Sequence, residues 1–226
     1  MNEERAPDSR ALVDLPAQPA ALLFVVLHGE GGEAAQMAPL ARALRGQYPQ
    51  AAIVSLNGPL PADGGFGWFA DPAAMEAALP DFIARIRAWA AHFALDWPLV
   101  ALAGFGQGAM LALEALQAEP ALAGRVIAIG GGYLARPEEA PHQVCVHLLH
   151  GMADEVHPVR PVVDAARTLV ALGADVTADV LPGIGHELHP QLVEKAMEQL
   201  RTFVPARLWR EAVLAAAEQD RQQKQQ

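Results

Sequence analysis

Short apolar runs alternate along the chain with longer segments whose apolar residues recur at helical spacing. This alternation is the signature of βα units around a mostly parallel sheet. The pattern predicts strands at residues 21–27, 51–56, 99–103, 125–129, 144–149 and 176–181. It predicts helices at residues 33–48, 72–93, 107–118, 158–172, 190–204 and 207–218. We therefore expect an α/β fold with helices flanking a mostly parallel sheet.

The length of 226 residues fits one domain with a single hydrophobic core. We predict that residues 21–218 form this domain, after an N-terminal segment at residues 1–20. Residues 219–226 have no apolar side chain to bury, and we expect them to be disordered. An apolar stripe on the predicted last helix could dock on the chain's own domain or on a second subunit, and we expect the former. The stripe consists of Trp209, Val213 and Ala216.

Composition and charge narrow the class of protein. With 52% hydrophobic and 19% charged residues, the composition is that of a globular enzyme. The net charge of -10 would repel phosphate backbones and anionic lipid headgroups, so nucleic acid is not an expected partner.

No apolar run approaches the ~20 residues of a membrane span, and residues 1–10 are polar where a secretory signal needs an apolar core. We expect a cytoplasmic protein, and Cys145, the single cysteine, leaves no intrachain disulfide.

Glycine- and histidine-containing motifs follow four of the predicted strands. In sheets of this kind, ligands bind outside the carboxyl ends of the strands, so these motifs are where chemistry is expected. The motifs are HGEGG at 28–32, GFGQG at 104–108, HGMADEV at 150–156 and GIGH at 183–186.

The motif at 104–108 stands between a predicted strand and a predicted helix, which is the context of a GxSxG nucleophile elbow. Its central residue is Gly106. Glycine accepts the strained backbone of such a turn, so the turn should persist, but glycine has no hydroxyl to attack a carbonyl carbon. Asp154 and His186 follow in the chain order acid then base that this fold uses. We expect them to supply the carboxylate and imidazole of a catalytic triad.

The four motifs, with Trp68-Phe69, resemble the phospholipase/carboxylesterase family over about residues 22–204. That family includes acyl-protein thioesterases and small bacterial carboxylesterases. The resemblance implies an α/β-hydrolase without a large cap that cleaves carboxylic esters or thioesters of modest acyl chains, with no cofactor or metal. The roles it implies are the nucleophile position for Gly106, the acid for Asp154, the base for His186, oxyanion-hole N–H groups for Glu30 and Gln107, and the acyl pocket for Trp68.

The sequence departs from this family at two positions. Family members carry serine where Gly106 stands, and they usually carry an apolar residue where Glu30 stands. An ionised Glu30 close to a developing oxyanion would oppose it unless the carboxylate turned to solvent. We therefore expect a chain that hydrolyses esters very slowly. A pseudo-hydrolase that only binds a small acyl ligand is the alternative, and monomer and homodimer both stay open.

Three other interpretations compete with this one. Gly104, Gly106 and Ala109 match the GxGxxA fingerprint of dinucleotide-binding folds, but the next predicted strand ends in glycines where an acidic residue should bind ribose. A metal site could use Asp154 together with His147, His150 and His157, yet His147 and His150 point to opposite faces of an extended strand. His189 is close enough in sequence to compete with His186, but its place before Pro190 at a helix start favours an exposed position.

Overall fold

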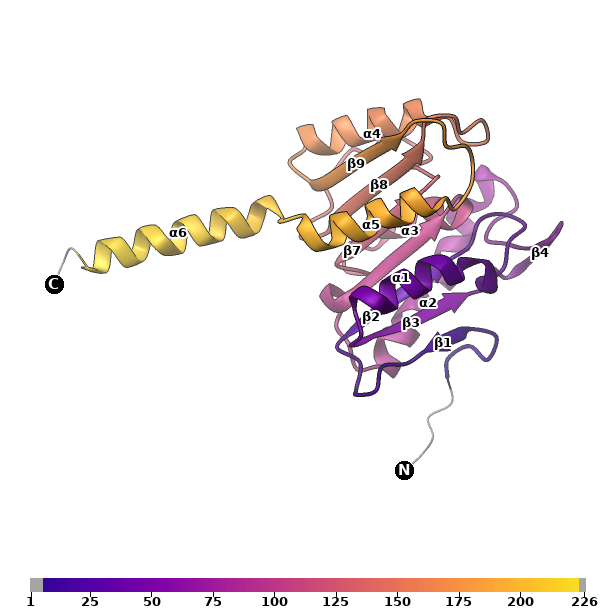
Figure 1. Cartoon of the computed structure of the whole chain (residues 1–226), viewed down its shortest axis with the longest axis horizontal. Coiled ribbons are helices and arrows are strands. Elements are labelled where there is room, and N and C mark those ends of the chain that lie inside the picture. Colours follow the sequence, from indigo (N-terminus) through magenta and orange to yellow (C-terminus); the bar gives the residue numbers. More distant parts are fainter. Residues whose placement is uncertain (1–5, 224–226) are drawn as a thin grey trace.

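A computed structural model describes residues 6–223 and shows a sheet with helices on both faces (Figure 1). The parallel strands are β2 (Leu22–Leu27), β3 (Ala51–Leu56), β6 (Val100–Phe105), β7 (Arg125–Ile129), β8 (Cys145–Gly151) and β9 (Asp175–Leu181). A short strand, β1 (Leu12–Asp14), pairs antiparallel with β3, and the spatial order is β1-β3-β2-β6-β7-β8-β9. The predicted α/β class with a mostly parallel sheet is confirmed.

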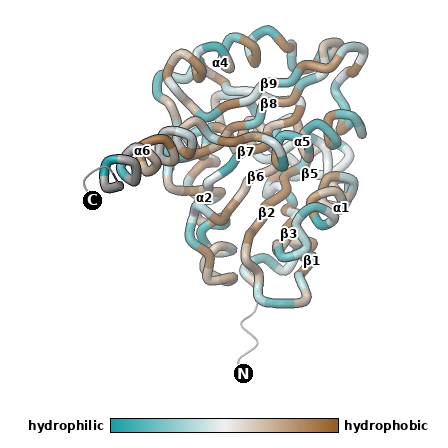
Figure 2. The backbone as a smooth tube through the Cα atoms, turned by 60° about the vertical axis from the view of Figure 1, so that its left-hand side comes forward, coloured by the Kyte–Doolittle hydropathy of each residue, from teal (hydrophilic) through white to brown (hydrophobic). Residues whose placement is uncertain are grey.

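Most of the parallel strands form where the sequence has mainly apolar runs, whereas β9 at the edge of the sheet carries polar residues and is only partly buried. All six residues of β3 and all seven of β8 are buried, because helices cover both faces of the sheet. The observed bounds of β3 and β7 equal the predicted ones, and the other parallel strands begin and end within two residues of their predictions. Figure 2 shows hydrophobic segments concentrated in the middle of the sheet, at β2 and β7.

Two groups of helices cover the two faces of the sheet. α1 (Ala38–Gln47) and α5 (Pro190–Thr202) pack their apolar sides on one face. α2 (Met75–His92), α3 (Gln107–Ala118) and α4 (Val159–Ala171) pack on the other face. Short 3-10 turns precede α1, α2 and β6, and they are η1 (Ala34–Met37), η2 (Pro72–Ala74) and η3 (Trp97–Leu99). None of the described helices has the length and apolar character needed to cross a bilayer.

Three short strands were not predicted from the sequence. β1 lies within residues 1–20, which the sequence leaves outside the domain, and its three residues are all exposed. β4 (Leu60–Ala62) and β5 (Gly65–Gly67) form a separate two-stranded sheet after β3. Strands of three residues are too short to show a period of two, so the hydrophobic pattern does not reveal them. The domain therefore starts before residue 21.

The last helix, α6 (Ala206–Gln223), projects away from the rest of the molecule (Figure 1). Trp209 and Val213 are each 63% exposed, so the expectation that this apolar stripe docks on the chain's own domain is wrong. We expected disorder from residue 219 onward, but α6 continues to Gln223, so this expectation is wrong for residues 219–223. Residues 224–226 lie outside the described part of the chain. Glutamine and arginine favour helix, which accounts for the longer helix.

Candidate active site

The motif at 104–108 forms a sharp turn from β6 into α3. Gly106 stands directly before the helix with φ +52° and ψ -119°, in the left-handed region that favours glycine. Its N–H donates to the carbonyl oxygen of Ile129 at 2.9 Å, and its carbonyl oxygen accepts from the N–H groups of Ala109 and Met110, both at 3.1 Å. The turn expected of a nucleophile elbow is therefore present, and hydrogen bonds hold Gly106 on both sides.

His186 and Asp154 form a direct hydrogen bond. The Nδ1 atom of His186 lies 2.8 Å from Oδ2 of Asp154. The two residues follow β9 and β8, which are neighbours in the sheet, so adjacent carboxyl ends bring them together. Because a carboxylate only accepts hydrogen bonds, Nδ1 carries the proton and Nε2 of His186 is left as an acceptor.

The Asp154 carboxylate is held on its other side by backbone groups. Its Oδ1 atom accepts from the N–H groups of Val156 at 3.0 Å and His157 at 2.8 Å. The Nε2 atom of the buried His150 lies 3.5 Å from Oδ2. Burial opposes ionisation of Asp154, but the hydrogen bonds from His157 and His186 outweigh burial and lower the pKa of its carboxyl. Asp154 is therefore ionised at neutral pH.

The imidazole of His186 is packed between two rings. Its centroid lies 4.7 Å from that of Phe105 and 4.9 Å from that of His157. Burial lowers the pKa of His157, so this second imidazole is neutral at pH 7 and adds no positive charge beside His186. A Cβ atom on Gly106 would lie 3.1 Å from Nε2 of His186. The basic nitrogen therefore faces the space where a side chain at position 106 would stand.

The loop after β2 also borders this space. The Nε2 atom of His28 accepts from the N–H of Gly58 at 2.9 Å, so its Nδ1 donates to the carbonyl oxygen of Gly29 at 2.6 Å. Burial lowers the pKa of His28 and keeps the ring neutral. The Cα atom of Gly29 lies 3.6 Å from the position of a Cβ on Gly106. His28 thus fixes the backbone that faces the turn.

A cavity of about 390 Å³ opens at His186, and Glu30, Phe105 and Gln107 line it. Gln107 is the first residue of α3, and the first N–H groups of a helix have no partner within the helix. The structure thus brings together at one cavity both residues predicted to supply oxyanion-hole N–H groups. The Glu30 side chain is exposed, and its carboxylate raises the pKa of His157, although burial lowers that pKa by more.

The Gln107 side chain ties this site to the segment that follows β5. Its Oε1 atom accepts from the N–H of Trp68 at 2.6 Å, and its Nε2 atom donates to the carbonyl oxygen of Phe69 at 2.9 Å. The indole Nε1 of Trp68 donates to the carbonyl oxygen of His28 at 2.8 Å. Trp68 therefore connects the loop after β2 with the start of α3.

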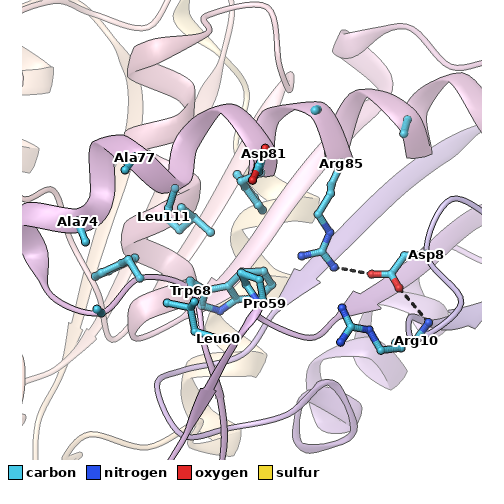
Figure 3. Close-up of a pocket in the computed structure, with 16 residues that line it drawn as sticks. Asp8, Arg10, Pro59, Leu60, Trp68, Ala74, Ala77, Asp81, Arg85 and Leu111 are labelled. Atoms are coloured by element: carbon cyan, nitrogen blue, oxygen red, sulfur yellow. Dashed lines mark hydrogen bonds and ion pairs between the residues drawn. The ribbon is translucent and has the colours of Figure 1, made fainter.

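Trp68 itself lines a second cavity, of about 750 Å³, with Leu60 and Leu111 (Figure 3). An ion pair closes one side of this cavity, in which Nη2 of Arg85 lies 2.6 Å from Oδ2 of Asp8. Among the described residues, none lines both this cavity and the one at His186. The acyl-pocket role of Trp68 stays a prediction, because Trp68 does not line the cavity at His186.

Two of the other histidines considered from the sequence, His189 and His147, have hydrogen-bond partners outside this pair. His189 caps the start of α5, where its Nδ1 accepts from the N–H of Gln191 at 3.2 Å. His147 is buried in β8, with its Nδ1 at 2.8 Å from Oγ1 of Thr177. Within residues 6–223, no group of three or more His, Cys, Asp or Glu side chains has the geometry of a metal site.

Sequence reasoning missed two contributions to the site. His157 was considered only as a metal ligand, yet its ring packs on His186 and its N–H supports Asp154. The side chain of Gln107 was not considered at all, although it holds Trp68. The position of His157 three residues after Asp154 could have suggested the hydrogen bond from its N–H, because an Asp side chain often accepts from the N–H groups that follow it.

Comparison with known proteins shows which family the chain resembles. Residues 9–204 match the family described as Phospholipase/Carboxylesterase. Esterase YpfH of Escherichia coli (strain K12) is 33% identical over 212 residues, which cover 89% of this chain and 91% of YpfH. The crystal structure of esterase PE8 superposes with a TM-score of 0.78 at 27% identity, and it covers 86% of this chain and 98% of PE8.

A further solved structure supports the fold alone. The carboxylesterase from Mesorhizobium loti has a TM-score of 0.70 at 24% identity, and the match covers 81% of this chain and 90% of that one. The architecture is thus that of an α/β-hydrolase, and no large cap domain is present among the described residues. With a family match over most of its length and an esterase relative of similar size, the chain belongs to the phospholipase/carboxylesterase family of hydrolases.

Proposed function

We propose that this chain is a carboxylic ester or thioester hydrolase scaffold of the serine-esterase type in which Gly106 stands at the nucleophile position. The observation that carries the proposal is the 3.1 Å between Nε2 of His186 and the position of a Cβ on Gly106. A serine side chain there would present its hydroxyl to a base that Asp154 already orients. The proposed activity of the chain as it stands is therefore very weak.

His186 is proposed as the general base and Asp154 as the residue that orients it. In a serine-containing scaffold, Nε2 of His186 takes the hydroxyl proton as the oxygen attacks the carbonyl carbon, and it returns the proton to the leaving group. Asp154 keeps the proton on Nδ1 and stabilises the imidazolium that forms. The lowered pKa of Asp154 supports this role, because the carboxyl stays ionised throughout.

The backbone N–H groups of Glu30 and Gln107 are proposed to bind the developing oxyanion. Their positions on the cavity at His186, and that of Gln107 at the start of a helix, support this assignment. The Glu30 carboxylate would oppose the oxyanion if it turned toward the reacting carbonyl, and the exposed side chain has room to turn to solvent. Trp68 is proposed to border the acyl group, which rests on its link to Gln107 and on the family resemblance.

Glycine at position 106 leaves a single route to hydrolysis. Losing the serine of such a triad costs on the order of 10⁶ in turnover, while oxyanion donors and substrate binding retain about 10³ to 10⁴ over water. A water beside Nε2 of His186 would be activated by general-base catalysis. We infer slow hydrolysis with no acyl-enzyme.

A second candidate function is the binding of a small acyl ligand without catalysis. The observation that favours it is the cavity at His186, which stays open although no side chain at position 106 can attack a ligand there. Ligand exchange without turnover would distinguish binding from slow hydrolysis.

The experiment that tests the proposal is the substitution Gly106→Ser, assayed with a short-chain p-nitrophenyl ester. We expect turnover to rise by several orders of magnitude, about 10² to 10⁶, over the parent chain. Adding His186→Ala to the serine form is the control and should remove the gain. If serine restores nothing in a folded protein, the proposal is wrong and the binding role becomes the better account, with Glu30→Leu as the next variant to test.

A further inference from the structure

The space beside Gly106 is bordered by the imidazole of His186 and the backbone of Gly29. A Cβ atom there would lie 3.1 Å from Nε2 and 3.3 Å from Cε1 of His186, and 3.6 Å from Cα of Gly29. It would thus have a hydrogen-bond acceptor on one side and a carbon atom on another. A serine side chain supplies one carbon and one hydroxyl, and methanol consists of the same heavy atoms.

A free alcohol needs more room than a side chain, because it is not bonded to Cα of Gly106. The cavity at His186 provides this room, since its volume of about 390 Å³ exceeds what one small alcohol occupies. Glu30 and Gln107, the proposed oxyanion donors, line the same cavity, so an ester bound there would lie beside them.

One feature favours an alcohol over water in this space. The carbon atom of an alcohol gains dispersion contacts with Cα of Gly29. Its hydroxyl keeps the same hydrogen bond to Nε2 that water would make. A bound alcohol therefore fills the vacant side-chain position more completely than water does.

We propose that this chain transfers acyl groups from esters to small primary alcohols, which bind in the space that Gly106 leaves open beside His186. The inference rests on the proposed function, because it uses the same base and oxyanion donors. It adds a substrate class, a second substrate that acts as acyl acceptor in place of the serine hydroxyl.

The reaction is a direct transesterification. The alcohol oxygen attacks the carbonyl carbon of the ester, and its proton passes to Nε2 of His186. The bond from the carbonyl carbon to the original leaving oxygen then breaks, and the proton passes from Nε2 to that oxygen. The products are a new ester and the original alcohol, with no oxidation and no covalent bond to the protein.

The test measures methyl butyrate and butyric acid formed from p-nitrophenyl butyrate as methanol is increased, with tert-butanol as the solvent control. We expect the unsubstituted chain to form methyl butyrate roughly 10²-fold faster than its His186→Ala variant, with saturation in methanol. Gly106→Ala should abolish the reaction, because its methyl group fills the space without supplying a hydroxyl. Asp154→Asn is a second loss variant if alanine at position 106 prevents folding.

Methyl butyrate formation that equals the His186→Ala rate, or that Gly106→Ala leaves unchanged in a folded protein, would overturn the inference. The Gly106→Ser form assayed in buffer without alcohol separates this failure from failure of the proposed function. If that form hydrolyses the ester while the parent chain forms no methyl ester, only the acyl-transfer inference is wrong. If neither form acts on the ester, the proposed function itself fails.

Discussion

The Nε2 atom of His186 lies 3.1 Å from the point at which a Cβ atom on Gly106 would stand. Asp154 fixes the other nitrogen of the same ring at 2.8 Å. The base, its orienting carboxylate and the turn are thus arranged around a side chain that glycine does not supply. This relationship links the fold to the proposed chemistry, and several predictions depend on it.

Any residue other than glycine at position 106 should adopt a strained backbone conformation. With φ at +52°, Gly106→Ser is expected to cost ~1 to 3 kcal/mol in the free energy of unfolding, of which about 0.4 to 1 kcal/mol returns through the unfolded chain. Gly173→Ser is the matched control, because Gly173 has φ +81° and no atom near its Cβ position. Chemical denaturation of both variants checks this. A Gly106→Ser protein more stable than its parent would show that the turn is not strained.

In the serine form, Asp154→Asn should lower kcat by about 10³ to 10⁴, because an amide no longer holds the proton on Nδ1 of His186. Asp164→Asn makes the same chemical change on α4, where the side chain is 55% exposed, and should leave kcat unchanged. Steady-state assays with one ester compare the two variants. Equal activity of the two would remove Asp154 from the mechanism.

Buried His147 should make the fold sensitive to acid. Burial lowers its pKa to about 3 in the folded chain, whereas an unfolded histidine titrates near ~6.5. Between these values the unfolded state binds one proton more, so stability is full above about pH 6.5 and falls by about 1.4 kcal/mol per pH unit as the pH drops. His147→Gln should flatten this slope, and His142→Gln, at an exposed position, should not. Urea denaturation at several pH values measures both slopes, and equal slopes contradict the prediction.

The exposed face of α6 should contribute little to the stability of the domain. Trp209 is 63% exposed, so we expect Trp209→Ala to change the free energy of unfolding by less than about 0.5 kcal/mol. Trp89 on α2 is 1% exposed, and Trp89→Ala should cost ~3 to 5 kcal/mol. A large loss for Trp209→Ala in thermal or chemical unfolding would mean that α6 docks on a surface in solution.

The sequence predicted the parts of the fold that depend on continuous apolar burial. β3 and β7 have their predicted bounds, because strands buried on both faces show as mainly apolar runs between turns. Asp154 and His186 were placed together because parallel strands end at the same edge of a sheet.

The parts that failed depend on tertiary contacts without a local pattern. Nothing periodic marks β1, which pairs with β3 through exposed residues. The apolar spacing of Trp209 and Val213 predicts a buried face on α6, but spacing alone does not say what would cover it. The ring contact of His157 with His186 likewise follows from how the loop after β8 folds back, which no motif encodes.

The most direct test of the central claim is the mass of the peptide that contains residue 106 after brief exposure to a p-nitrophenyl ester. The Gly106→Ser protein should carry one acyl group on this peptide, and adding His186→Ala should abolish the adduct. The parent chain, which has no hydroxyl at this position, should show none. An acyl group on the same peptide of the parent chain, or no adduct on a folded serine form, would contradict the account that Gly106 stands where a serine esterase has its nucleophile.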